Sequence, residues 1–204
     1  MTDDVTVVPA NEASWEDLQA IFGTRGYTST CQCQRFKAGP FGYSPMDPEE
    51  RAWQLRVQSA ADLPESALTS GLVAYLDGEP VGWCAVEPRS AFKRLPRQRT
   101  VFKERGEDPA DKSVWALTCF AIRAGYRRRG FTYPLARAAV EFARERGARA
   151  IEGYPMAPEP GQDITWGETH VGTRSVFAAA GFEEVAHPTL RRLVMRIDLS
   201  GAAP

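Results

Sequence analysis

Hydrophobic and polar residues alternate along the chain with two different periods, which predict a domain built from both strands and helices. Apolar residues spaced three and four apart predict helices over residues 14–22, 48–60, 133–146 and 173–180. Short apolar, β-branched runs predict strands over residues 5–8, 72–76, 81–86, 114–122, 148–154, 182–186 and 191–199. Residues 23–47 follow neither period, so we expect them to be irregular. Residues 88–112 form a long polar segment with no predicted helix or strand, and residues 156–170 are predicted to be a loop.

The helix boundaries carry recognisable signals. Ser14 precedes an apolar-periodic run and is predicted to cap the first helix. Pro48 stands at the start of the second helix, where its missing N–H group costs nothing. We expect that helix to turn Ala52, Leu55 and Val57 toward the core.

The connections between the predicted strands define a mixed sheet. The turn Asp77-Gly78-Glu79-Pro80 joins two strands and predicts an antiparallel hairpin. Residues 114–122 are almost continuously apolar, as in a central strand buried on both faces. The helix between this strand and the next predicts that the two strands run parallel. The fold class is therefore α/β (α+β), with a mixed, mostly antiparallel central sheet and helices on both faces.

Composition supports one globular domain over residues 1–204. Hydrophobic residues make up 43% of the chain and charged residues 25%, and the formal net charge is −1. This balance excludes extensive disorder and argues against a nucleic-acid partner, which would require a basic surface. No apolar run approaches the roughly 18 residues of a membrane span, and the acidic start is unlike a secretory signal. We expect a cytoplasmic protein with no membrane partner.

The segment Arg127-Arg128-Arg129-Gly130-Phe131-Thr132 lies between the predicted central strand and an amphipathic helix. Gly130 lets the backbone approach a ligand closely, because it has no side chain. The free N–H groups of the helix's first turn and the helix dipole favour an anion at this end. With three arginines beside it, the turn predicts a phosphate- or pyrophosphate-binding site.

The same segment resembles motif A of the GCN5-related N-acetyltransferase (GNAT) superfamily, written Gln/Arg-x-x-Gly-x-Gly/Ala. Arg127 and Gly130 match that pattern, whereas Thr132 departs from its last position and Pro134 removes one N–H group from the first turn. The order of elements over about residues 3–199 is also similar to that family. The resemblance implies a GNAT-like acyl-CoA N-acyltransferase fold, acetyl-CoA as co-substrate and direct attack by an amine in a ternary complex.

The resemblance also implies which residues bind the cofactor. Its pantetheine arm would pair with the strand backbone at Cys119, Phe120, Ala121 and Ile122, and its pyrophosphate with Arg127, Arg128, Arg129, Gly130, Phe131 and Thr132. Two later positions of the family, an asparagine that touches the cofactor and a tyrosine that acts as the acid, correspond to His170 and Phe177. Phe177 cannot donate a proton, so the usual acid is missing.

Glu152 and Tyr154 are the candidates for proton transfer or amine binding, because residues two apart on a strand share a face. A carboxylate in an apolar strand is costly unless it is paired or functional, so a structural ion pair is the alternative for Glu152. Glu87, at the end of the hairpin, is a further base candidate, with a solvated strand end as its alternative. His170 is a candidate base or cofactor contact, and its alternative is a surface group or an N-terminal cap of the following helix.

The four cysteines do not indicate a metal site. Cys31-x-Cys33 has no partner pair or nearby histidine, and structural zinc needs four ligands. Cys84 and Cys119 lie in apolar strands and are expected to be core thiols, and no histidine spacing supports thiol catalysis. Residues 88–112 carry eight Lys/Arg against four Asp/Glu, which fits a substrate lid, a site for the cofactor's 3′-phosphate or a solvated loop.

The predicted function is transfer of an acetyl group from acetyl-CoA to a primary amine of a small molecule or peptide. A non-catalytic CoA-binding sensor or interaction module with the same fold is the alternative, favoured by Phe177, Thr132 and Pro134. The sequence does not identify the acceptor, since fold does not fix substrate. A homodimer is expected from the resemblance alone.

Overall fold

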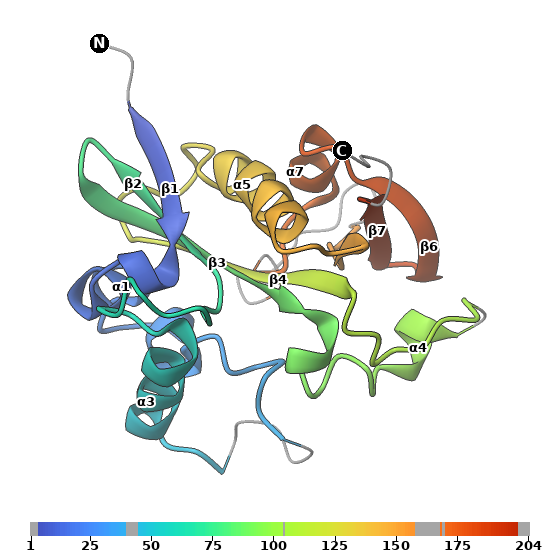
Figure 1. Cartoon of the computed structure of the whole chain (residues 1–204), viewed down its shortest axis with the longest axis horizontal. Helices are drawn as coiled ribbons and strands as arrows, with labels where there is room; N and C mark the ends of the chain where they lie inside the picture. The colour runs from blue at the N-terminus through green and yellow to red at the C-terminus, as the bar shows by residue number, and fades with distance from the viewer. Residues whose placement is uncertain (1–3, 40–44, 104, 158–167, 169, 200–204) are drawn as a thin grey trace.

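The computed structural model describes residues 4–39, 45–103, 105–157, 168 and 170–199, which form one seven-stranded sheet between two layers of helices (Figure 1). The strands are β1 (Val5–Pro9), β2 (Leu72–Leu76), β3 (Glu79–Pro88), β4 (Val114–Ile122), β5 (Ala150–Gly153), β6 (Glu183–Thr189) and β7 (Arg192–Asp198). Their order across the sheet is β1-β2-β3-β4-β5-β7-β6. The mixed, mostly antiparallel sheet is confirmed.

The predicted connections are also confirmed. β2 and β3 pair antiparallel around the Asp77-Gly78 turn, and β4 pairs parallel with β5. The remaining neighbours are antiparallel. β4 therefore lies in the middle of the sheet with helices on both faces, which explains why its sequence is apolar at nearly every position.

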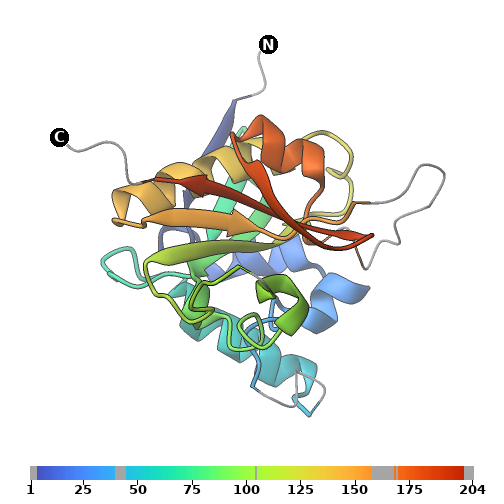
Figure 2. The same cartoon turned by 90° about the vertical axis from the view of Figure 1, so that its right-hand side faces the viewer.

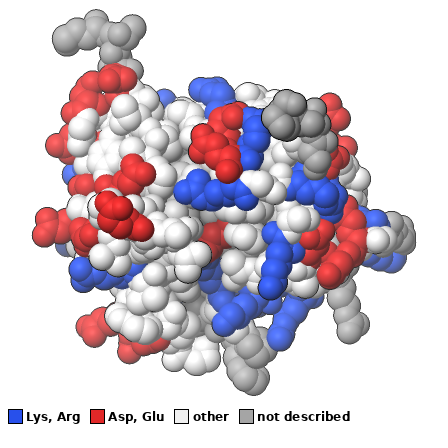
Figure 3. All heavy atoms as spheres, in the orientation of Figure 1, with Lys and Arg blue, Asp and Glu red and all other residues white. Residues whose placement is uncertain are grey.

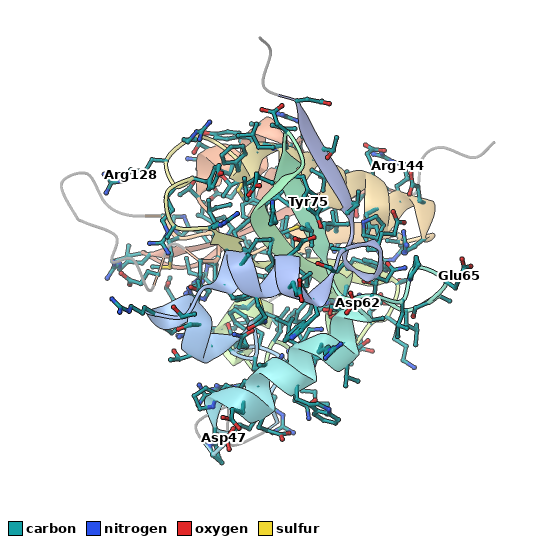
Figure 4. The ribbon with its side chains drawn as sticks, turned by 90° about the vertical axis from the view of Figure 1, so that its left-hand side faces the viewer. Asp47, Asp62, Glu65, Tyr75, Arg128 and Arg144 are labelled. Carbon is teal, nitrogen blue, oxygen red and sulfur yellow. The ribbon has the colours of Figure 1, made fainter. Side chains whose placement is uncertain are left out.

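Two buried apolar clusters, one on each face of the sheet, form the core. One face is covered by α5 (Thr132–Glu145) and α7 (Arg174–Ala179), and the other by α1 (Trp15–Phe22), α2 (Tyr27–Cys31) and α3 (Pro48–Ser59) (Figure 2). The Ser14 hydroxyl accepts a hydrogen bond from the Asp17 N–H at 3.0 Å, so the predicted cap of α1 is confirmed. The Asp47 side chain caps α3 in the same way, at 2.7 Å (Figure 4).

Three local predictions are wrong. Residues 23–47 contain α2, which hydroxyl groups stabilise locally, since Thr28 donates to the Phe22 carbonyl and Ser29 to the Gly26 carbonyl. Residues 88–112 contain two short helices, η2 (Arg89–Ala91) and α4 (Arg99–Phe102). Val57 is 58% exposed, because α3 buries only Leu55 and Ser59.

Candidate active site beside β4 and α5

The site begins where two parallel strands separate. β4 and β5 pair from Val114–Ala150 to Leu117–Gly153 and no further. Beyond Leu117, β4 continues to Ile122 paired with β3 alone, and the β3–β4 register shifts at Thr118, a bulge. The backbone of residues 118–122 therefore presents one edge that β5 does not cover.

A cavity of about 830 Å³ lies at this end of β4. Its walls come from β4, the turn before α5, the first turn of α5 and residues 170–176. Eight of the predicted cofactor-binding residues line it, namely Phe120, Ile122, Arg127, Arg128, Gly130, Phe131, Thr132 and His170. The other four, Cys119, Ala121, Arg129 and Phe177, are not among its lining residues.

The turn before α5 has the backbone shape that an anion site needs. Arg128 and Gly130 both adopt left-handed conformations, with φ of 62° and 84°. Glycine adopts this conformation without strain. Space is not the reason for a glycine here, because a Cβ at this position would meet no atom closer than 3.8 Å. No side chain caps α5, and its first turn borders the cavity, so the positive end of the helix dipole lies beside the cavity.

The three arginines of the turn point in different directions. The Arg127 Nε donates to the Ile122 carbonyl at 3.2 Å, which links the turn to the end of β4. Arg128 lies at the outer edge of the protein with its side chain extended (Figure 4). The Arg129 guanidinium packs over the Tyr126 and Phe131 rings, 5.4 Å from each centroid. Arg127 and Arg128 border the cavity, whereas Arg129 contributes charge from behind these rings.

Residue 170 contacts the edge of β4 that β5 does not cover. The Phe120 N–H donates to the His170 carbonyl at 2.6 Å. His170 is only 8% exposed, and its ring lies 5.9 Å from that of Tyr27 and 6.3 Å from that of Phe36. Its imidazole ring thus packs beside two aromatic rings, and the residue forms part of the cavity wall.

Phe177 supports the cavity wall from inside the core. It is fully buried and packs edge-on against Phe120 and Phe182, at centroid distances of 6.1 and 5.0 Å. Gly153 and Gly172 make room for it, since a Cβ at Gly153 would overlap the Phe177 ring and one at Gly172 would come within 2.8 Å. The phenyl group has no proton to donate.

Glu152 lies at the centre of a buried ion-pair cluster, which we define as Arg89, Arg105, Glu107, Glu152 and Arg196. Glu152 is fully buried and accepts hydrogen bonds from Arg89 at 3.0 Å, from Arg196 at 2.9 Å and from Arg105. Glu107 lies within 3.3 Å of the same three arginines. The cluster joins the segment after β3 to β5 and β7.

Burial acts on both residues predicted for catalysis. It raises the pKa of the Glu152 carboxyl, but the Arg105 hydrogen bond and the charges of Arg105 and Arg89 outweigh it, so that pKa lies below its usual value. Burial, together with the negative charge of Glu152, raises the pKa of Tyr154 well above its usual value. The Tyr154 hydroxyl donates to Glu152 at 2.8 Å.

Neither residue is among those that line the cavity. The alternative weighed for Glu152, a structural ion pair, is what the contacts show, while a role of Glu152 or Tyr154 in proton transfer stays a prediction. Sequence reasoning missed Arg89, Arg105 and Arg196 as partners. The only signal was the basic excess of residues 88–112, which supply two of these arginines.

Glu87, the further base candidate, also has partners. Its carboxylate pairs with the buried Lys37 and accepts a hydrogen bond from the Ser70 hydroxyl at 2.8 Å. The solvated strand end weighed as its alternative is therefore wrong. Among the described residues, no three His, Cys, Asp or Glu side chains are grouped so that they could hold a metal ion.

Comparison with known proteins shows the family. The model of the acetyltransferase (GNAT) family matches residues 32–155, more than half of the chain. The protein belongs to this acetyltransferase family, as the Arg127–Thr132 motif indicated. No curated protein matches the sequence significantly.

Solved structures show the same fold at low identity. The chain is 13% identical to yncA of Salmonella typhimurium, solved with its cofactor acetyl-CoA, with a TM-score of 0.54 over 98% of this chain and 96% of that one. It is 20% identical to a GCN5-related N-acetyltransferase of Kribbella flavida, with a TM-score of 0.51 over 95% and 97%. An N-acetyltransferase of Staphylococcus aureus Mu50 is 14% identical, with a TM-score of 0.53 over 97% and 99%.

The surface adds little to this assignment. Acidic and basic side chains are intermixed on the face shown in Figure 3, in keeping with a net charge of −1. Within the described part of the chain, no helix has both the length and the apolar character needed to span a bilayer.

Proposed function

We propose that the protein transfers an acetyl group from acetyl-CoA to a primary amine of a small molecule or peptide, by direct attack in a ternary complex. Family membership supports acetyl transfer in general. The observation that carries the finer proposal is the cavity of about 830 Å³ that the motif turn shares with the uncovered end of β4. Its volume suits an elongated cofactor together with a small acceptor group.

The residues of the cavity fit this cofactor. The N–H groups at the start of α5, together with Arg127 and Arg128, would hold the pyrophosphate. The backbone of Phe120 and Ile122 would pair with the pantetheine arm, for which the His170 carbonyl must release the Phe120 N–H. When bound, the cofactor supplies the activated thioester.

We propose His170 as the group that removes the proton from the attacking amine. His170 is among the residues that line the cavity, whereas Glu152 and Glu87 are engaged by arginine and lysine side chains. A general base must lie within hydrogen-bond reach of the proton it takes, and position decides before pKa does. Phe177 offers no proton, so the proton for the leaving thiol would come from water or from another group.

The alternative function, a CoA-binding module without turnover, is favoured by one specific observation. The position of the family's tyrosine acid is filled by the fully buried Phe177. The two functions differ in whether thiol is released in the presence of amines, and both require the cofactor to bind.

Calorimetric titration with acetyl-CoA, CoA and 3′-dephospho-CoA tests binding directly. We expect micromolar affinity, and about tenfold weaker binding, near 1.4 kcal/mol, for Arg127→Ala. Arg144→Ala is the matched control, because Arg144 lies in the last turn of α5, away from the cavity, and pairs with Glu141 on the surface (Figure 4). Absence of binding by the wild-type protein would refute both functions.

A thiol-release screen over small amines and peptides then separates the enzyme from the sensor. For His170→Ala, we expect roughly a hundredfold or greater fall in kcat with acetyl-CoA affinity retained. An unchanged kcat in His170→Ala would rule out the assigned base, and turnover without any amine requirement would rule out amine transfer.

A further inference from the structure

A pair of cysteines lies on the sheet face opposite the cavity. Trp83 and Ala85 of β3 are in register with Ala121 and Cys119 of β4, which places Trp83 and Cys119 close together. The Trp83 indole N–H donates to the sulfur of Cys33 at 3.1 Å. Cys33 and Cys119 belong to the same apolar cluster on this face, and Cys119 is the side chain with the largest influence on the pKa of Cys33. The fold thus brings together two thiols that are 86 positions apart in the chain.

The backbone fixes Cys33 in this position. Gln32 and Cys33 follow α2 and have φ angles of 45° and 56°. This left-handed region is unfavourable for residues with side chains, and two consecutive residues rarely adopt it. The surrounding packing must hold the turn in place, and the turn keeps the thiol against the indole.

The surroundings of Cys33 favour its thiolate. The neighbouring Cys119 side chain lowers the pKa of Cys33, burial opposes it, and the Trp83 N–H and the nearby Lys37 lower that pKa further. The net direction is below the usual value, although Glu87 opposes it. The other thiols differ, because burial raises the pKa of Cys31 and Cys84, and the Cys33 side chain and burial raise that of Cys119.

Cys33 and Cys119 are less completely buried than Cys84. Cys33 is 6% exposed and Cys119 is partly exposed, whereas Cys84 is fully buried in β3. Hydrogen peroxide is little larger than a water molecule, so limited exposure is enough to admit it. The thiolate is the species that reacts.

We propose that Cys33 and Cys119 form an oxidant-sensitive thiol pair whose substrate is hydrogen peroxide or a small alkyl hydroperoxide. The Cys33 thiolate attacks the O–O bond, takes one oxygen as a sulfenic acid and releases hydroxide or an alkoxide. The Cys119 sulfur then attacks the Cys33 sulfur, and the hydroxyl group leaves with the Cys119 proton as water. The two thiols are oxidised to a disulfide, the peroxide is reduced, and a small dithiol reverses the change.

The disulfide would tie the turn after α2 to the strand that borders the cavity. Cys119 is one residue before Phe120, whose N–H bonds the His170 carbonyl. Oxidation therefore acts on the edge of β4 predicted to bind the cofactor arm, from the opposite face. This inference does not depend on acetyl transfer, because the thiol chemistry requires no cofactor.

The test uses the reduced full-length protein and hydrogen peroxide, followed by intact-mass and non-reducing peptide mass spectrometry. We expect loss of two hydrogen atoms and one crosslink, between Cys33 and Cys119. Cys31→Ser and Cys84→Ser are matched controls that should form this crosslink at the wild-type rate. Cys119→Ser should stop at a Cys33 sulfenic acid that dimedone traps. A crosslink through Cys31 or Cys84, or none at all, would overturn the proposal.

A second measurement needs no variant and so does not depend on folding. Under limiting iodoacetamide at neutral pH, peptide mapping of the wild-type protein should show Cys33 modified at least tenfold faster than Cys31 or Cys84. Trp83→Phe keeps an aromatic ring but removes the N–H, and should slow Cys33 modification severalfold if circular dichroism shows that the variant is folded. Equal rates for Cys33 and Cys31 would contradict the proposed activation.

Discussion

Replacing Glu152 by glutamine tests whether the buried ion-pair cluster is structural. The glutamine keeps the size and one acceptor oxygen but removes the negative charge that three arginines share. Arg89 is fully buried, so water cannot replace the lost carboxylate. Its remaining partners are the Glu107 carboxylate at 3.3 Å and the carbonyls of Asp108 and Pro109. An uncompensated buried charge typically costs about 3–5 kcal/mol. Because Glu107 remains, we expect a loss near the lower end, about 3 kcal/mol.

Urea unfolding, followed by circular dichroism, measures this loss in the free energy of unfolding. The comparison holds if the dependence of that free energy on urea concentration is the same in both proteins. Glu141→Gln is the matched control, since Glu141 pairs with Arg144 on the surface of α5 and should change stability by less than about 0.5 kcal/mol. If Glu152→Gln were as stable as the wild type, the structural interpretation would be refuted. A stable Glu152→Gln that binds acetyl-CoA but has lost turnover would instead support the role in proton transfer.

Three further outcomes follow from described contacts. Folding lowers the pKa of Glu152 from its ordinary value of 4.5, so the ionised carboxylate stabilises the folded state fully above pH 4.5. This stabilisation is lost as the pH falls toward the pKa in the folded protein. The stabilities of the wild type and Glu152→Gln, measured by acid titration, should therefore converge at low pH. Gly153→Ala would force a methyl group into the Phe177 ring, and calorimetric melting should show that the free energy of unfolding falls by about 1–3 kcal/mol. An unchanged stability would show that the ring moves aside freely. Ser14→Ala removes the hydrogen bond to the Asp17 N–H and should cost about 1 kcal/mol in urea unfolding, while an unchanged midpoint would deny the cap any role.

The parts of the fold that the sequence predicts are those with strong local signals. The apolar run of β4, the amphipathic α5 and the Asp77-Gly78 turn each depend on neighbouring residues, and the parallel pairing follows from chain direction. The short helices escape prediction because periodicity does not stabilise them. Hydroxyl groups bond locally in α2, and α4 packs against β6, which is distant in the sequence.

The candidate site divides in the same way. The turn around Gly130 is contiguous in sequence, so its residues could be named before the structure was known. The partners of Glu152 could not, because Arg89 and Arg196 come from positions 63 and 44 residues away. The contact between Cys33 and Trp83 spans 50 residues, and nothing near either residue in the sequence indicates it.

The ion-pair cluster also has a consequence for the kinetics of folding. Its members come from the segment after β3, from β5 and from β7, so the complete set of charges meets only when the whole sheet is assembled. Before that, the arginines and carboxylates keep their hydration, and bringing them together requires closing long loops. Weakening the cluster should therefore accelerate unfolding while leaving the folding rate nearly unchanged. The lifetime of the native state, more than the speed of reaching it, would depend on Glu152.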